Sequence, residues 1–318
     1  MKLFRMVPDN TKIKFIEARY FAYVVSTIMI LGSIVLFFTK GLNYGIDFKG
    51  GVMIQIQTEK AVNLPPLRSG LDSLGLGDVS IQTFGAPNAL LIRFRGSKSE
   101  AKGTKQVDMV KAKIQQLIPG KVDFQQVQSI GGKVSKELVT SGILSLLLAM
   151  GAVVIYIWFR FEWQFGIAAI VALIHDVSAT IGLFSLTGIE FNLSIIAALL
   201  TIVGYSLNDT VVVFDRVREN LRKYRKMPLP ELLNLSVNDT LTRTIMTSTT
   251  TLLALSALLF FGGEVIRGFT AAMIWGIVVG TYSSIYVASP ILMFTNVRRD
   301  YDDGASKGKA KEGIKAKA

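Results

Sequence analysis

Six long apolar segments dominate the pattern of hydrophobic and polar positions along the chain. Each is close to the roughly 20 residues that an α-helix needs to cross the hydrocarbon core of a bilayer. We therefore predict membrane spans at Tyr20–Phe38, Leu138–Trp158, Gln164–Leu186, Leu193–Phe214, Thr244–Phe261 and Gly268–Phe294. Gly276 and Gly280 in the last span have the spacing that lets two membrane helices approach closely.

The segment between the first two spans has a different pattern. Residues 51–58 alternate Val52, Ile54 and Ile56 with Met53 and glutamines, which is the period of a half-buried strand. Further strands are predicted at Val79–Phe84, Leu90–Phe94 and Val122–Val127, and helices follow Pro65 and Ser99. The resulting βαββαβ order is that of a ferredoxin-like α+β domain.

Basic residues predict the orientation of the spans, because Lys and Arg gather on the cytoplasmic side of a membrane protein. Several precede the first span and follow the fourth, whereas the connection Thr187–Asn192 has none. We therefore predict that both termini are cytoplasmic and that the first large loop lies outside. The predicted parts are a cytoplasmic N-terminus at 1–19, span one at 20–38, and the external ferredoxin-like domain at 39–137. Spans two to six follow at 138–294 with a cytoplasmic loop near 215–243, and a basic, disordered cytoplasmic tail is predicted at 295–318.

Composition and motifs exclude several classes of function. The chain is 50% hydrophobic, with 35 Lys and Arg against 23 Asp and Glu, and this identifies a membrane protein with basic ends. It contains no cysteine, so the outer domain must fold without disulfides. We find no nucleophile with a base, no metal cluster, no phosphate loop and no nucleic-acid motif in the sequence. We therefore expect no enzyme activity, no cofactor, no metal and no nucleic-acid partner.

Asp209 lies within the fourth apolar segment, near its inner end. A charge at the centre of a membrane helix costs about 2.5 to 3.5 kcal/mol, so such residues usually face a protein interior or a wet cavity and carry function. Arg243 precedes the fifth span, and an antiparallel arrangement of spans four and five would bring it to Asp209. Pairing favours the charged carboxylate and burial favours the neutral one, so the pair could exchange a proton. The alternatives are a fixed structural ion pair and an arginine that extends to the cytoplasmic surface.

Three more polar residues within the spans are candidates. Thr247 begins a run of hydroxyl residues that offers a route for water, although such residues often bond only their own backbone. Asp176 and His175 lie in the third span as secondary candidates, of which Asp176 is the stronger. Because neighbouring helical positions point in different directions, we predict no direct pair between them.

Segments throughout the chain resemble one family. They are Gly45–Gly51 (GIDFKGG), Gly204–Arg216 (GYSLNDTVVVFDR), Thr240–Thr244 and Phe261–Phe269. On these motifs the chain resembles the SecD/SecF family, in particular the SecF subunits of the bacterial Sec translocase. The resemblance implies a polytopic α-helical membrane protein, with a six-helix bundle like that of the resistance-nodulation-division (RND) transporters and a ferredoxin-like periplasmic domain.

The resemblance also implies a function. A SecF-like subunit would work in the inner membrane with SecD, using the proton motive force to complete preprotein translocation through the SecYEG channel after the SecA ATP-dependent step. The family's proton pathway falls on Asp209, Arg243 and Thr247, with protons as the coupling ion, and YajC and YidC are further implied partners. Two alternatives remain. One is a non-conducting structural partner that stabilises the translocon, and the other is a half-size RND-type exporter of lipids or drugs.

Overall fold

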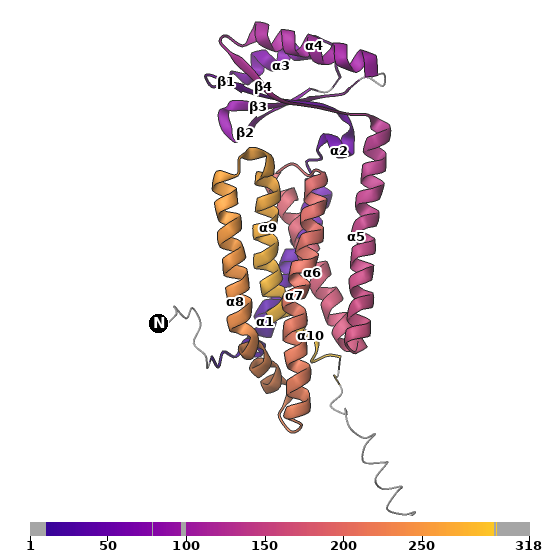
Figure 1. Ribbon diagram of the computed structural model, residues 1–318, viewed down its shortest axis with the longest axis vertical. Coiled ribbons are helices and arrows are strands. Elements are labelled where there is room, and N and C mark those ends of the chain that lie inside the picture. Colours follow the sequence, from indigo (N-terminus) through magenta and orange to yellow (C-terminus); the bar gives the residue numbers. More distant parts are fainter. Residues whose placement is uncertain (1–10, 78, 97–99, 296, 298–318) are drawn as a thin grey trace, which may run out of the picture.

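The computed structural model describes residues 11–77, 79–96, 100–295 and 297. It consists of a bundle of long helices with a small sheet domain stacked over one end (Figure 1). Residues 1–10 and nearly all of the basic tail predicted at 295–318 lie outside the described residues, so the predicted disorder of that tail stays a prediction.

Six helices among the described residues are long and apolar enough to cross a membrane, which confirms the predicted number. The 3-10 helix η1 (Phe15–Ala18) leads into the first of them. The helices are α1 (Arg19–Thr39), α5 (Gly132–Arg160), α6 (Trp163–Thr187), α7 (Leu193–Lys223), α8 (Leu229–Phe261) and α9 (Glu264–Ser283), the last continuing through the π-helical turn η2 (Ser284–Ala288) into α10 (Ser289–Ile291).

The segment 215–243, predicted as a loop, is mostly helical because α7 and α8 both extend into it. Side chains join the two extensions beyond the apolar stretches. Arg216 Nε donates to Asp239 Oδ2 at 2.8 Å, and Asn220 Nδ2 donates to Ser236 Oγ at 3.0 Å. The predicted spans were ended where polar residues begin. In the structure these polar residues join the two helices and stabilise their pairing.

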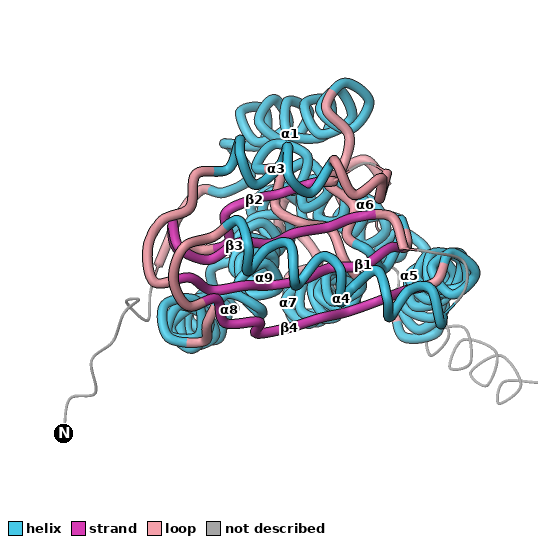
Figure 2. Tube along the Cα trace, turned by 90° about the horizontal axis from the view of Figure 1, so that it is seen from above, coloured by secondary structure: helices cyan, strands magenta, loops and turns pink. Residues whose placement is uncertain are grey.

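The bundle has an inner set of helices, α6, α7 and α9, around which α1, α5 and α8 are arranged (Figure 2). Its largest fully buried side chains include Phe165, Phe184 and Phe214. Gly276 of α9 lies directly against Ile202 of α7, so a side chain larger than hydrogen would overlap that isoleucine. The close helix contact predicted from the glycine spacing is therefore present.

The outer domain has the predicted βαββαβ order. It comprises β1 (Gly51–Thr58), α3 (Leu64–Asp72), β2 (Ser80–Phe84), β3 (Ala86–Phe94), α4 (Glu100–Leu117) and β4 (Val122–Ile130), preceded by the short helix α2 (Ile46–Lys49). The strands form one antiparallel sheet in the order β2-β3-β1-β4. The strand predicted from Leu90 begins at Ala86, because pairing with β2 continues up to a tight turn at Gly85, whose φ is +78°.

The two faces of the sheet have different partners. Val52, Ile54 and Ile56 of β1 are fully buried against α3 and α4, which cover the face of the sheet turned away from the bundle (Figures 1 and 2). The opposite face carries polar side chains, including Gln55 and Arg93, toward the helices. Because successive side chains of a strand point to opposite faces, the apolar residues form the core of the domain and the polar ones face the bundle.

Two glycines in membrane helices should respond in opposite ways to the same substitution. Gly276→Ala should lower the free energy of unfolding by about 1 to 3 kcal/mol, because the added methyl group overpacks the contact with Ile202. Gly151→Ala, the matched control, adds a methyl group with nothing within 4 Å and should leave stability equal or higher. Thermal unfolding in detergent measures both, and equal effects would contradict the assigned α7–α9 contact.

Candidate functional site

Asp176 lies on α6 at the point where α6, α7 and α9 meet, and it is fully buried. Its Oδ2 accepts hydrogen bonds from Ser206 Oγ of α7 at 2.5 Å and from Ser283 Oγ of α9 at 2.8 Å. A buried carboxylate in apolar surroundings is costly unless donors satisfy it. Asp176 therefore holds three helices together through its own hydrogen bonds.

His175 does pair with Asp176, so the prediction of no direct pair is wrong. His175 Nδ1 lies 2.9 Å from Asp176 Oδ1, and both side chains are buried. Although the two Cβ atoms leave the helix in different directions, the side chains are long enough to turn toward each other, and the apolar surroundings favour that pairing. His175 Nε2 is buried with no hydrogen-bond partner among the described residues.

A second group of hydroxyl side chains lies next to this cluster, around the π-helical turn η2. Ser284 Oγ is 2.8 Å from Thr210 Oγ1 of α7 and also donates to the carbonyl oxygen of Gly280 at 2.9 Å. Ser289 Oγ donates to the carbonyl of Ser284, five residues earlier, at 2.9 Å. Single π-helical turns are frequent at functional sites, because they change the backbone hydrogen bonding locally.

Asp209 is also buried, on the same helix as Ser206, with only 3% of its surface exposed. Unlike Asp176, it has a carboxylate oxygen, Oδ2, with no hydrogen-bond partner among the described residues. Ser206 precedes it by one helical turn, so Asp209 and the donor to Asp176 lie on neighbouring parts of one helix face. The bundle therefore contains one carboxylate that is well supplied with hydrogen-bond donors and one with a buried oxygen that lacks a partner among the described residues.

Arg243 lies on α8, near enough for its charge to act on Asp209. Its side chain is exposed at the bundle surface, and no direct ion pair joins the two within the described part of the chain. Thr247, one turn later, donates to the carbonyl oxygens of Arg243 and Thr244, at 3.1 and 3.0 Å. Its hydroxyl thus bonds its own helix, which was the simpler of the two predicted alternatives.

The sequence analysis missed the two serine partners of Asp176, Ser206 and Ser283, and the neighbouring hydroxyl pair of Thr210 and Ser284. All four residues lie inside apolar stretches. The available signal was that small hydroxyl residues from different spans recur near an aspartate. That signal is weak, because a hydroxyl in a membrane helix can equally bond its own backbone.

Comparisons with known proteins give a consistent result. A family model described as the C-terminal region of the protein export membrane proteins SecD/SecF matches residues 109–298, and one described as the SecD/SecF GG motif matches residues 35–62. The protein translocase subunit SecF of Rickettsia felis is 45% identical over 92% of this chain and 95% of its own length. The subunit of the same name from Cereibacter sphaeroides is 45% identical, with 93% of both chains covered.

Solved structures show the same similarity. The crystal structure of SecDF from Thermus thermophilus, a translocon-associated membrane protein, matches 92% of this chain with a TM-score of 0.82 and 36% identity. A SecDF structure in a super-membrane-facing form matches with a TM-score of 0.63 and 34% identity. This chain covers 40% and 41% of the lengths of those two solved chains. With relatives covered over nearly their whole length, the chain belongs to the SecF family of protein translocase subunits.

Proposed function

We propose that this SecF-family subunit works with SecD in a bacterial inner membrane and uses the proton motive force to complete preprotein translocation through SecYEG after the SecA step. Its direct contacts would be SecD, the lipid bilayer and the translocating preprotein, with YajC and YidC as further partners. The role is transport without catalysis, and protons are the coupling ion. The names and coverage of the relatives support translocation, and the buried carboxylates support proton coupling.

Asp209 carries the proposal. A carboxylate enclosed by the bundle with an unsatisfied oxygen is poorly stabilised in its charged form, so the neutral form competes with it. The charge of Arg243 acts in the opposite direction. A residue balanced in this way can gain and lose a proton when water or a partner changes its surroundings. A purely structural subunit would need no such residue.

The exposure of Arg243 supports SecD as the partner at this surface. Asn208 on α7 and Arg243 on α8 are both polar and exposed at the bundle surface, where lipid would leave them poorly satisfied. The solved SecDF chains are more than twice as long as this one, so a second half could cover the surface. We assign Thr247 a supporting role, because its oxygen remains free to accept a hydrogen bond. A half-size exporter is disfavoured by the names of the relatives.

The distribution of basic residues supports the proposed orientation. Arg160 ends α5 and Lys223 ends α7, both at the end of the bundle opposite the sheet domain. Since basic residues favour the cytoplasmic side, that end of the bundle would be cytoplasmic and the sheet domain periplasmic.

The first test of the proposal is Asp209→Asn, which keeps the shape of the side chain but removes its ability to carry a proton. We expect complete loss of proton-dependent stimulation of preprotein translocation in inverted membrane vesicles, with SecD association retained. The matched control is Asp215→Asn on the same helix, whose carboxylate pairs with Arg160 at 2.9 Å and is partly exposed. Proton-dependent stimulation at the wild-type level in Asp209→Asn would refute the assignment.

The two buried aspartates should differ in their effect on stability. Asp176→Asn should lower the free energy of unfolding by about 1 to 3 kcal/mol, because the amide has one acceptor oxygen in place of two, so that either the serines or His175 would face its nitrogen. Asp209→Asn should leave stability unchanged or raise it, because it removes a buried carboxylate with an oxygen that lacks a hydrogen-bond partner. Unfolding of the purified variants in detergent measures both. A larger loss for Asp209→Asn would contradict the division between a structural and a switching carboxylate.

A double-mutant cycle tests the coupling of Arg243 to Asp209. Combining Arg243→Met with Asp209→Asn in the isolated chain should give a coupling energy below about 0.5 kcal/mol, because no ion pair joins them there. In the complex with SecD the coupling should rise to between about 0.5 and 3 kcal/mol, as the covered pair loses solvent. Equal, negligible coupling in both states would show that Arg243 extends to the surface and leaves Asp209 alone.

A further inference from the structure

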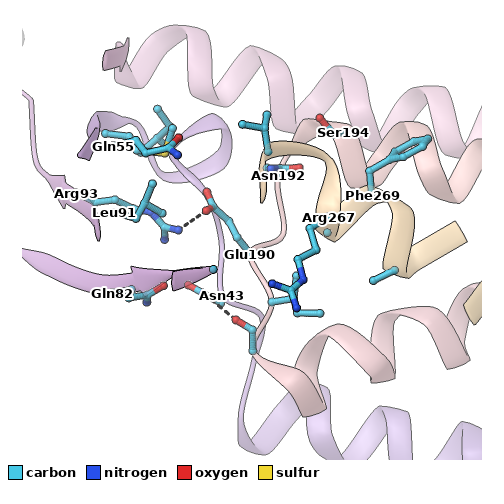
Figure 3. Close-up of a pocket in the computed structure, with 18 of the residues that line it drawn as sticks. Asn43, Gln55, Gln82, Leu91, Arg93, Glu190, Asn192, Ser194, Arg267 and Phe269 are labelled. Carbon is cyan, nitrogen blue, oxygen red and sulfur yellow. Dashed lines mark hydrogen bonds and ion pairs between the residues drawn. The ribbon is translucent and has the colours of Figure 1, made fainter. Parts of the chain in front are cut away.

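A cavity of about 570 Å³ separates the sheet domain from the end of the bundle beneath it. One wall is the polar face of the sheet, including Gln55, Gln82 and Arg93, and the other includes Glu190, between α6 and α7, and Phe269 of α9 (Figure 3). Polar side chains lie among apolar ones on both walls, so water can enter and find hydrogen-bond partners on either side. The sheet domain therefore rests on the bundle across a cavity, without a continuous apolar contact there.

One ion pair joins the two walls of this cavity. The guanidinium of Arg93 on β3 contacts the carboxylate of Glu190 in the α6–α7 connection (Figure 3). The two side chains are only 12% and 19% exposed, so the pair is largely shielded from solvent. These residues are 97 positions apart in the chain, and their contact joins the sheet domain directly to the bundle.

The segment that leads from α1 to the sheet domain is hydrogen-bonded to the bundle before it reaches the first strand. Gly45 N donates to the carbonyl oxygen of Phe191 at 2.9 Å, and Phe191 N donates to that of Asn43 at 2.8 Å. Asp47 Oδ2 accepts a hydrogen bond from Leu193 N, at the start of α7, at 2.8 Å. The chain up to α2 is thus fixed to the α6–α7 connection, and freedom of the sheet domain begins after it.

The two segments that connect the sheet domain to the bundle lie side by side, one directly after α2 and the other directly before α5. Gly50 and Gly51 connect α2 to β1 with φ angles of +70° and +126°, which side chains other than glycine rarely adopt. Gly51 pairs with Ile130 at the end of β4, and α5 begins at Gly132. The Cα of Gly132 is 3.3 Å from the position that a Cβ on Gly50 would take. Two adjacent glycine joins form a hinge through which a domain can turn as one body.

The ion pair is not strongly stabilised. Burial raises the pKa of Glu190 above its ordinary value, the nearby Asp47 carboxylate adds to this rise, and Arg93 opposes it. Burial is the largest of these effects, so the loss of water offsets much of the attraction between the two charges. Arg93 Nε is also buried with no partner among the described residues. Separation would return both groups to water, and the contact is therefore reversible.

We infer that Arg93 and Glu190 form a releasable latch, which holds the sheet domain on the bundle and allows it to turn about the hinge at Gly50–Gly51 and Gly131–Gly132 when it opens. The cavity supplies the space and the water for separation. The role of the latch is to position the domain. Only its consequence for export depends on the proposed function, since the movement itself requires no proton gradient.

Spin labels can measure the movement directly, because the chain has no cysteine of its own. One label is placed at Met109→Cys on α4, which is 50% exposed, and one at Val265→Cys at the domain end of α9, which is 67% exposed. The full chain in lipid nanodiscs should give one narrow distance by pulsed electron paramagnetic resonance. Arg93→Gln and Glu190→Gln should each lose that single distance and gain a longer, broader population.

Two further variants separate a latch from general destabilisation. The exchanged pair, Arg93→Glu with Glu190→Arg, should restore the narrow distance, because the attraction is the same with the charges reversed. The control Arg160→Gln breaks an ion pair with Asp215 at the other end of the bundle and should leave the distance unchanged. Unchanged distances in both single variants would overturn the latch, as would failure of the exchanged pair to restore them. Wild-type distances in Asp209→Asn would show that the latch holds independently of proton coupling.

Discussion

The bundle depends on supplying Asp176 with hydrogen-bond donors in a place that water does not reach. A buried carboxylate without donors would cost several kcal/mol. The donors come from two other helices, so α6, α7 and α9 must keep one relative position for Ser206 and Ser283 to reach it. Gly276 serves the same requirement, because it brings α9 close to α7. The inner helices therefore form a rigid unit.

Asp209 differs from Asp176 in how its buried carboxylate is surrounded. It lies on the same helix as Ser206, yet one of its oxygens lacks a partner and the arginine near it is exposed on a peripheral helix. The peripheral helices α5 and α8 also bury less of their surface than the inner ones. The bundle thus combines a fixed centre with an adaptable side, which suits a subunit whose surroundings change when it works with a partner.

The sequence predicted the features that depend on length and period. The bilayer sets the length of a span, and alternation of Val52, Ile54 and Ile56 sets the face of a strand, so both were recovered. The extension of α7 and α8 was missed because bonds such as that between Arg216 and Asp239 join residues far apart in the chain. The contacts of the candidate residues were predicted only in part. Polar residues in apolar stretches identified Asp209 and Asp176, but side-chain direction decides pairing, and no local pattern predicts the Arg93–Glu190 contact.

The π-helical turn after α9 has a consequence for the way this helix can adjust. A regular helix that gains or loses one residue turns everything after it by about 100°. A π-helical turn accommodates one extra residue in a wider turn, and the side chains that follow keep their direction. Ser283 and Ser284 are neighbours where this turn begins, and the first bonds Asp176 of α6 while the second bonds Thr210 of α7. Two consecutive side chains thus reach two different helices, and one wide turn secures both contacts.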